Sequence, residues 1–299
     1  MTMLLRLTKQ EALALTHLCR GPSTVSGLAS SLGAGESFAS RLVHSLEEKG
    51  LAAAERKGVG KTVRLSDLPH AQAFRRLYDS RPQARIEEWV SGHSIEVLIV
   101  LLDNGAKAEA LLSECACSKP SLYKVLNSLI AVGVVGKTEW GAFRIVDRSV
   151  SEFTEGFANG VQLQMQKQLH GHNVGIRVRK HVLVRSDAKE APAWFAATGI
   201  SLLADKGLEA VQTSYSDYYF NLDGRKREIG VEEAFIHALL LTTVQQHQDK
   251  PVLAIFLNKN WKRLNQEKLW ELARSYHVEN DFKELVTAIG YHVKLREWE

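Results

Sequence analysis

The sequence of 299 residues has few cysteines and few prolines, and it has no long apolar run without charges. Its three cysteines, an odd number, do not form a disulfide framework, so we expect a reducing compartment. A membrane span needs about eighteen or more consecutive apolar residues, and no such stretch is present. A charged helix occupies residues 1–21, where a signal peptide would need an apolar core. We therefore predict a cytoplasmic protein without a membrane partner.

The signatures of several enzyme classes are also missing. There is no P-loop, no G-x-G-x-x-G fingerprint, no H-E-x-x-H motif and no G-x-S-x-G elbow. His170 and His172 are two residues apart, but a zinc site needs more ligands than two. Acidic residues are frequent in residues 217–233, although glutamates at the start of a helix usually complement its dipole. We predict no enzyme, no cofactor and no metal.

The charge of the chain is small but unevenly distributed. The hydrophobic fraction of 45% and the charged fraction of 24% are typical of a globular protein with two or three domains. The formal net charge is +4 for the whole chain and +3 for residues 1–68 alone, whereas residues 151–299 are neutral. A basic excess in one segment suggests a polyanionic partner for that segment.

Residues 1–68 show the pattern of three helices. Thr8 is placed to cap a first helix, with Glu11 in capping-box position, and Ser23 is placed to cap a second. A third helix, ESFASRLVHSLEEK, ends at Gly50, where a left-handed cap favours glycine. The spacing predicts that the third helix buries Phe38, Leu42, Val43 and Leu46.

Two predicted strands, LAAAER and KTVRL, follow and are joined by the glycine-rich loop of residues 57–60. Three helices and a hairpin with a basic tip resemble the winged helix-turn-helix of the MarR and ArsR groups of transcription regulators. The resemblance implies that the third helix enters the major groove of double-stranded DNA and that the hairpin, or wing, contacts phosphates. The implied recognition residues are Ser37, Ser40, Arg41 and His44. The implied wing residues are Arg56, Lys57 and Lys61.

The same unit occurs again 83 residues later. LVHSLEEKGL, which begins at residue 42, aligns with VLNSLIAVGV, which begins at residue 125. The second copy spans residues 91–148, and its hairpin is predicted to turn at Trp140-Gly141. Its first helix is apolar on nearly every side, so we expect it to be packed against other parts of the chain or a dimer partner. The DNA-facing residues of the second copy would be Lys119, Ser121, Tyr123, Lys124 and Asn127.

The segment SECACSK resembles the Cys-x-Cys of metal-sensing ArsR proteins. Under the repeat, however, Cys115 takes the place of Leu32 and Cys19 the place of Leu102. These are core positions, and free cysteine behaves as a small buried hydrophobe. We therefore predict buried, structural cysteines.

The remaining segments complete the predicted α+β fold, which is predominantly α. Residues 69–90 form a linker helix interrupted at Pro82, and residues 149–173 form a connecting helix that either mediates dimerisation or supports the next domain. Its apolar stripe is Val150, Phe153, Phe157, Val161 and Met165. Residues 174–299 form an α+β effector or assembly domain, in which Tyr215, Tyr218, Tyr219 and Phe220 line either an effector pocket or an ordinary core.

The segment from WFAATGISLLADKGL to VEEAFIHALLL resembles the C-terminal domain of abortive-infection antitoxins, which are winged-helix proteins that meet a nucleotidyltransferase toxin. Our leading hypothesis is a sequence-specific, homodimeric DNA-binding transcription regulator with a small-molecule or protein effector at the C-terminal domain. A protein-interaction module, such as an antitoxin that docks a toxin or a transcription-machinery subunit, is the alternative. A nucleic-acid-processing enzyme ranks third.

Overall fold

The computed structural model describes residues 5–57, 60–207, 215–245 and 249–296, without the side chains of Lys57 and residues 291–296. The chain is α+β and predominantly helical, as predicted. It divides into two compact units, Met1–Met165 with Leu222–Gly224, and Gln166–Asn221 with Arg225–Glu299. Within the described residues, every helix is too short or too polar to cross a membrane.

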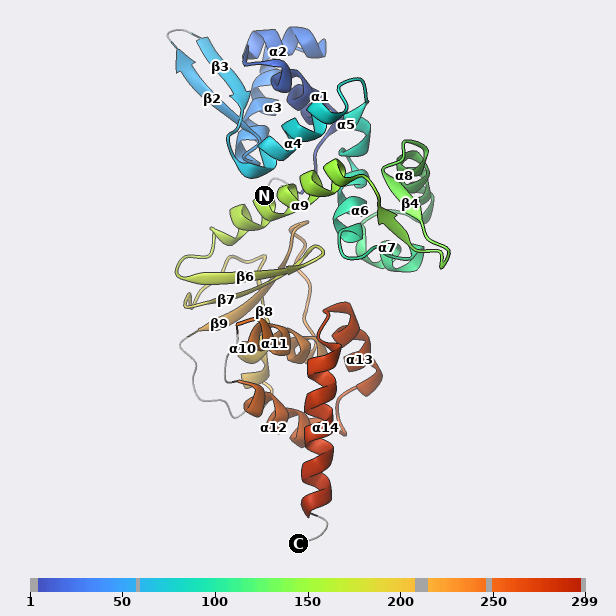
Figure 1. Cartoon of the computed structure of the whole chain (residues 1–299). Coiled ribbons are helices and arrows are strands. Elements are labelled where there is room, and N and C mark those ends of the chain that lie inside the picture. Colours follow the sequence, from blue (N-terminus) through green and yellow to red (C-terminus); the bar gives the residue numbers. More distant parts are fainter. Residues whose placement is uncertain (1–4, 58–59, 208–214, 246–248, 297–299) are drawn as a thin grey trace. The chain divides into compact units, whose positions relative to one another are not determined.

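The first unit begins with three helices and a small antiparallel sheet, whose strand order is β1-β3-β2 (Figure 1). Thr8 and Glu11 form the predicted capping box at the start of the first helix. Gly50 has φ +67° and ends the third, as its position in the sequence indicates. The elements are α1 (Lys9–Arg20), β1 (Ser23–Thr24), α2 (Val25–Leu32), α3 (Glu36–Glu48), β2 (Ala52–Lys57) and β3 (Gly60–Leu65).

Two local predictions are wrong in this region. Thr24, not Ser23, caps α2, because Ser23 pairs with Val63 in the sheet and the Thr24 hydroxyl accepts the amide of Gly27. The side chain of Phe38 is 39% exposed, and Ala39 takes its place in the core. Both positions are compatible with helical spacing, so only packing against α1 and α2 decides between them.

The same order of elements returns with an offset of 83 residues. These elements are α6 (His93–Leu101), α7 (Ala108–Glu114), α8 (Lys119–Ala131), β4 (Val135–Lys137) and β5 (Phe143–Ile145). Both ends of α8 are 83 residues beyond those of α3, and Gly133 repeats the positive φ of Gly50. Residues Ser94–Leu101 of α6 are all buried and contact α5, α7 and α8. The elements that bury this apolar helix therefore belong to the same chain.

Three further helices complete the first unit: α4 (Pro69–Ser80), α5 (Ile86–Trp89) and α9 (Arg148–Gln166). The apolar stripe predicted for residues 149–165 is buried, and Phe153 meets Phe74 of α4 with ring centroids 5.3 Å apart. This stripe therefore packs within its own chain and is not exposed for contact with a second copy. Gly160 lets α9 approach His70, because a Cβ there would lie 2.7 Å from Nδ1 of the imidazole.

In its described residues, the second unit consists of a four-stranded antiparallel sheet, of order β6-β7-β9-β8, and five helices (Figure 1). The strands are β6 (Asn173–Val178), β7 (His181–Ser186), β8 (Ala196–Ala197) and β9 (Ser216–Asn221). The helices are α10 (Gly199–Ala204), α11 (Val231–Gln245), α12 (Lys250–Asn260), α13 (Gln266–Ser275) and α14 (Glu279–Arg296).

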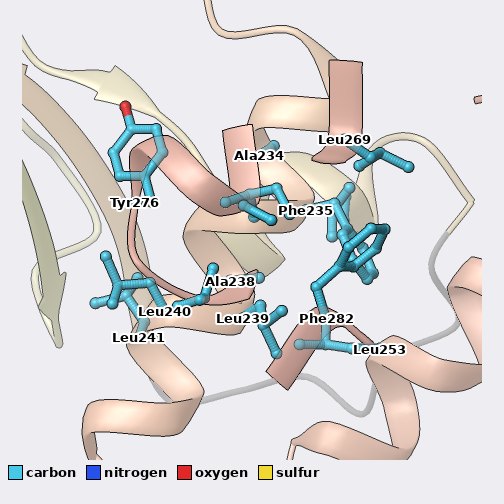
Figure 2. Packing of buried hydrophobic residues seen from close by; sticks show 14 of the residues in the cluster. Ala234, Phe235, Ala238, Leu239, Leu240, Leu241, Leu253, Leu269, Tyr276 and Phe282 are labelled. Carbon is cyan, nitrogen blue, oxygen red and sulfur yellow. The ribbon is translucent and has the colours of Figure 1, made fainter. Parts of the chain in front are cut away.

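Helix α11 forms the centre of this unit. The apolar spacing of Phe235, Ala238, Leu239 and Thr242 predicts a single buried face, but every residue from Glu233 to Thr242 is buried. Figure 2 shows Phe235, Leu239 and Phe282 among the side chains that fill the interior. Helices α12, α13 and α14 surround α11 because it is apolar on all sides.

Several predicted boundaries in this unit need correction. The alternation of apolar and basic residues in VGIRVRKHVLVRS predicts one strand, but the segment forms two paired strands, because Arg179 adopts a positive φ and turns the chain between β6 and β7. The pattern of residues 209–229 predicts short strands around the turn at Asp223-Gly224. Of the described residues, β9 precedes this turn and residues 225–230 after it are not a strand. PVLAIFLNKN, which fits either a helix or a strand by pattern, lies in α12. By residue type, Asn280 or Asp281 is predicted to cap the last helix, but α14 starts at Glu279, so both residues lie in its first turn and do not cap it.

Candidate nucleic-acid interface

Helix α3 places all four predicted recognition residues in solvent. Ala39, Leu42, Val43 and Leu46 are buried, so the opposite face of the same helix is exposed. Ser37, Ser40, Arg41 and His44 all lie on that exposed face. Arg41 forms no ion pair with any described residue, and its guanidinium is therefore available to a ligand.

Other charges of the first hairpin and of α3 neutralise each other. Nζ of Lys61 lies 3.0 Å from the carboxylate of Glu47, and Nε2 of His44 lies 3.6 Å from Glu48. The contact with Glu47 reduces the positive charge that Lys61 offers to an anion. The sequence contained a signal for this, because α3 has three glutamates, Glu36, Glu47 and Glu48.

The hairpin β2–β3 is in register from Ala52–Leu65 to Lys57–Gly60. Arg56 pairs with Lys61 across the strands, and its exposed side chain forms no ion pair with a described residue. Gly58 and Val59, at the predicted wing tip, lie outside the described residues, as does the side chain of Lys57.

A buried ion pair fixes α3 against α1. Nζ of Lys49 lies 2.5 Å from Oε1 of Glu11, and the Ser45 hydroxyl donates to the same oxygen at 2.7 Å. Burial raises the pKa of Glu11, but the charge of Lys49 and the hydrogen bonds from Lys49, Thr8 and Ser45 outweigh it and lower the pKa. The residue that completes the cap of α1 thus also holds the end of α3.

Helix α8 presents a more uniformly basic face. Leu122, Leu126 and Leu129 are buried. Lys119, Tyr123, Lys124 and Asn127 are exposed. Ser121 differs from the prediction, because it is half-buried and its hydroxyl lies 2.9 Å from that of the capping residue Ser118. Helix α8 contains no aspartate or glutamate, and Lys119 and Lys124 form no ion pair with a described residue.

The hairpin β4–β5 brings an aromatic side chain to the surface beyond α8. Thr138 and Ala142 close a tight turn, in which the Thr138 amide donates to the Ala142 carbonyl at 2.7 Å. Trp140 lies in this turn with 84% of its surface exposed, more than any other large hydrophobic residue described. The turn was expected from Trp140-Gly141, but a role for the indole was not. A tryptophan in the predicted turn of the hairpin was the signal in the sequence that could have indicated this.

The second unit contains a largely buried polar network. Tyr219 accepts from Arg227 at 2.9 Å, and Nδ1 of His181 lies 2.7 Å from the Tyr219 oxygen. Arg227 also pairs with Glu233, which accepts from the Tyr276 hydroxyl at 3.0 Å. Burial raises the pKa of Glu233, but the adjacent His237, Arg227 and Tyr276 outweigh it and lower the pKa to about 2.

Three of the acidic residues in residues 217–233 have separate cationic partners. Asp217 is fully buried and pairs with Arg185, Glu232 pairs with Lys268, and Glu233 pairs with Arg227. These three carboxylates therefore do not converge on one site. Among the described residues, no three His, Cys, Asp or Glu side chains are placed to hold a metal ion.

A pocket of about 450 Å³ lies beside Arg185 in the second unit. Tyr215 and His172 line it, whereas Tyr218, Tyr219 and Phe220 are buried in the sheet. The aromatic run is therefore mostly core, and one member of it reaches a pocket. Cys19 and Cys115 are buried, as the repeat predicts, and burial raises the pKa of Cys19 to about 12.

Comparison with known proteins gives no independent assignment. No protein-family model matches the chain, and a search of curated proteins finds no match. The candidate interface therefore rests on the exposed residues of α3, α8 and their two hairpins.

Proposed function

We propose that this protein is a sequence-specific DNA-binding transcription regulator. The observation that carries the proposal is the repeated succession of three helices and an antiparallel hairpin, offset by 83 residues, with a solvent-facing third helix in each copy. Two winged helix-turn-helix modules, residues 1–68 and 91–148, account for this arrangement. In such a module the third helix reads base edges and the hairpin contacts phosphates.

Arg41 is the proposed base-reading residue of the first module. It is exposed, lies in the middle of α3 and has no described carboxylate partner. Replacing it with alanine should weaken binding to the cognate site by about 1–3 kcal/mol and relax base preference. Replacing Lys57 and Lys61 should weaken binding to all duplexes and flatten the salt dependence.

The test is fluorescence anisotropy with duplex DNA from upstream of the protein's own gene, against excess random duplex, at two salt concentrations. Wild type should bind the upstream duplex tightly, resist the competitor and weaken with salt. Lys262→Ala, which removes an exposed cation from the other unit, is the matched control and should bind as wild type. Absence of binding even at low salt would reject the regulator function.

A homodimer would match a palindromic operator. The stripe of α9 is buried, so we propose that the dimer uses another surface. Sedimentation analysis of the full chain distinguishes a dimer from a monomer.

One observation favours the alternative, a protein-interaction module. A groove of about 340 Å³ lies between α12 and α14, and Ile255 beside it is 57% exposed. Exposed apolar surface of this kind is typical of protein contacts. If DNA binding fails, a toxin or a transcription-machinery subunit becomes the leading partner, and chemical cross-linking from Lys250 or Lys259 would identify it.

A further inference from the structure

Among the described residues, α8 and the β4–β5 hairpin carry four cations without a carboxylate partner, whereas α3 and the β2–β3 hairpin carry two, Arg41 and Arg56. Helix α3 carries three glutamates and one exposed cation, Arg41, whereas α8 carries Lys119 and Lys124 and no acidic residue. Near the first hairpin, Lys61 is held by Glu47 and Arg64 by Asp67.

The second hairpin is different. Lys137 and Arg144 are exposed on its strands and form no ion pair with any described residue, although Lys137 lies over the ring of Phe143. A cation without a carboxylate partner can neutralise a phosphate without breaking an ion pair, and each neutralised phosphate releases counterions from the DNA. The four free cations of α8 and the β4–β5 hairpin therefore fit a polyanionic partner.

Trp140 lies between these cations in the sequence, at the turn of the hairpin. Figure 1 shows the tip of this hairpin at the outer edge of its group of helices. The tight turn fixes the backbone, because the Gly141 amide donates to Thr138 and the Ala142 amide donates to the Thr138 hydroxyl. Trp140, which is 84% exposed on this fixed turn, gains no free energy from apolar burial against the described part of the chain.

We propose that α8 and the β4–β5 hairpin form the dominant contact with duplex DNA, and that Trp140 is an aromatic wedge against the bases of the minor groove. This inference rests on the proposed function and assigns the leading role to the second copy. Lys119 and Lys124 contact phosphates beside the major groove. Lys137 and Arg144 bind the sugar-phosphate backbone of the DNA and so position the hairpin. Apolar side chains inserted between base steps kink DNA and are supported by flanking cations in this way.

The charge of this face selects DNA over a protein partner. Glu139 is the only acidic residue between Lys119 and Arg144. A tryptophan that anchored a protein contact would be surrounded by a largely uncharged surface, because charged residues are depleted at interface cores.

Trp140 can be observed directly. The emission of the full-length wild type minus that of Trp140→Phe isolates the signal of this indole from the other tryptophans. A random-sequence duplex of about three helical turns is the probe, so no operator is needed. Because the side chain is exposed, the variant should retain the wild-type circular dichroism spectrum and melting temperature.

We expect duplex DNA to quench the Trp140 signal along the same titration curve as the anisotropy. Trp140→Ala should weaken binding by about tenfold or more, as loss of a base-stacking aromatic does. Lys119→Ala with Lys124→Ala should reduce the slope of log affinity against log salt by about 2, and Arg41→Ala by about 1 or less.

Two outcomes would overturn the inference and leave the proposed function intact. If saturating DNA binds the chain but leaves the Trp140 fluorescence unchanged, Trp140 does not contact the bases. A Trp140 signal that changes with protein concentration, and not with DNA, would assign the hairpin to contact between copies. Failure of the full-length protein to bind any duplex at low salt would reject both proposals together.

Discussion

The buried pair of Glu11 and Lys49 allows a quantitative test of how α3 is held in place. Only 4% of the Glu11 side chain and 3% of the Lys49 side chain are exposed. Lys49→Met keeps a side chain of similar length and removes the ammonium, which leaves the carboxylate buried with two donors, the amide of Thr8 and the hydroxyl of Ser45, each at 2.7 Å.

Breaking a buried ion pair from one side costs about 3–5 kcal/mol. Because two hydrogen bonds to Glu11 remain, we expect a loss of about 3 kcal/mol, the lower end of that range. Hydrogen exchange of amides in α1 and α3, measured by mass spectrometry on the full chain, should then be about 150-fold faster.

The loss should depend on pH. In the wild type the folded-state pKa of Glu11 is below its unfolded value, so its stabilisation is present above about pH 4.5 and is lost as pH falls through the folded pKa. In Lys49→Met, burial acts without the opposing charge and the pKa of Glu11 rises. Protonation then relieves the unpaired charge, so the difference from wild type should shrink as the pH is lowered from 8 towards about 5.

Lys9→Met is the matched control. Lys9 lies 3.5 Å from Glu88, but 52% and 37% of these two side chains are exposed, and an exposed pair contributes about 0–1 kcal/mol. Exchange in Lys49→Met that is no faster than in Lys9→Met, or a loss that is the same at every pH, would refute the electrostatic account of the α1–α3 contact.

Three other changes have defined outcomes. Gly160→Ala should lower the free energy of unfolding by about 1–3 kcal/mol in thermal unfolding, since the new Cβ meets the His70 imidazole. The control, Gly290→Ala, has open space around it and should be neutral or stabilising. Equal effects of the two substitutions would contradict the close packing of Gly160 against His70. Arg227→Met should move acid unfolding to higher pH, because Glu233 stabilises the fold above about pH 4.5 and loses this as pH falls through about 2 in the wild type. Superimposable acid titrations by circular dichroism would exclude the Arg227 contribution. Cys19 should react with iodoacetamide about a thousandfold more slowly than a free thiol at neutral pH, because burial raises its pKa to about 12; rapid labelling of native protein, located by mass spectrometry, would show that the first unit opens readily.

Local sequence determined the elements of the first unit. The Thr8–Glu11 capping box and the left-handed Gly50 and Gly133 each depend on residues within one or two turns of a helix, and the 83-residue repeat extends the assignment of elements to the second copy. The buried positions of Cys19 and Cys115 followed from the same repeat. Such features can be predicted because the hydrogen bonds and φ values that create them involve neighbours in the sequence.

Boundaries that depend on pairing partners could not be predicted in this way. Ser23 is as well suited to cap a helix as Thr24, but it pairs with β3 and becomes part of strand β1. Ala196 and Ala197 fit the following helix, but they pair with β9 as strand β8. The competing structures are close in local free energy, and a partner strand supplies the hydrogen bonds that decide.

The sequence by itself also determined which residues of α3 and α8 are polar, and therefore which residues are candidates for DNA contact. Only the tertiary structure decided which of their charges remain available. Glu47 reaches Lys61 across 14 positions, Glu11 reaches Lys49 across 38, and Lys119 and Lys124 meet no described carboxylate. The energy of a charge depends on its distance to other charges and on its burial, and both are set by the fold rather than by the order of residues.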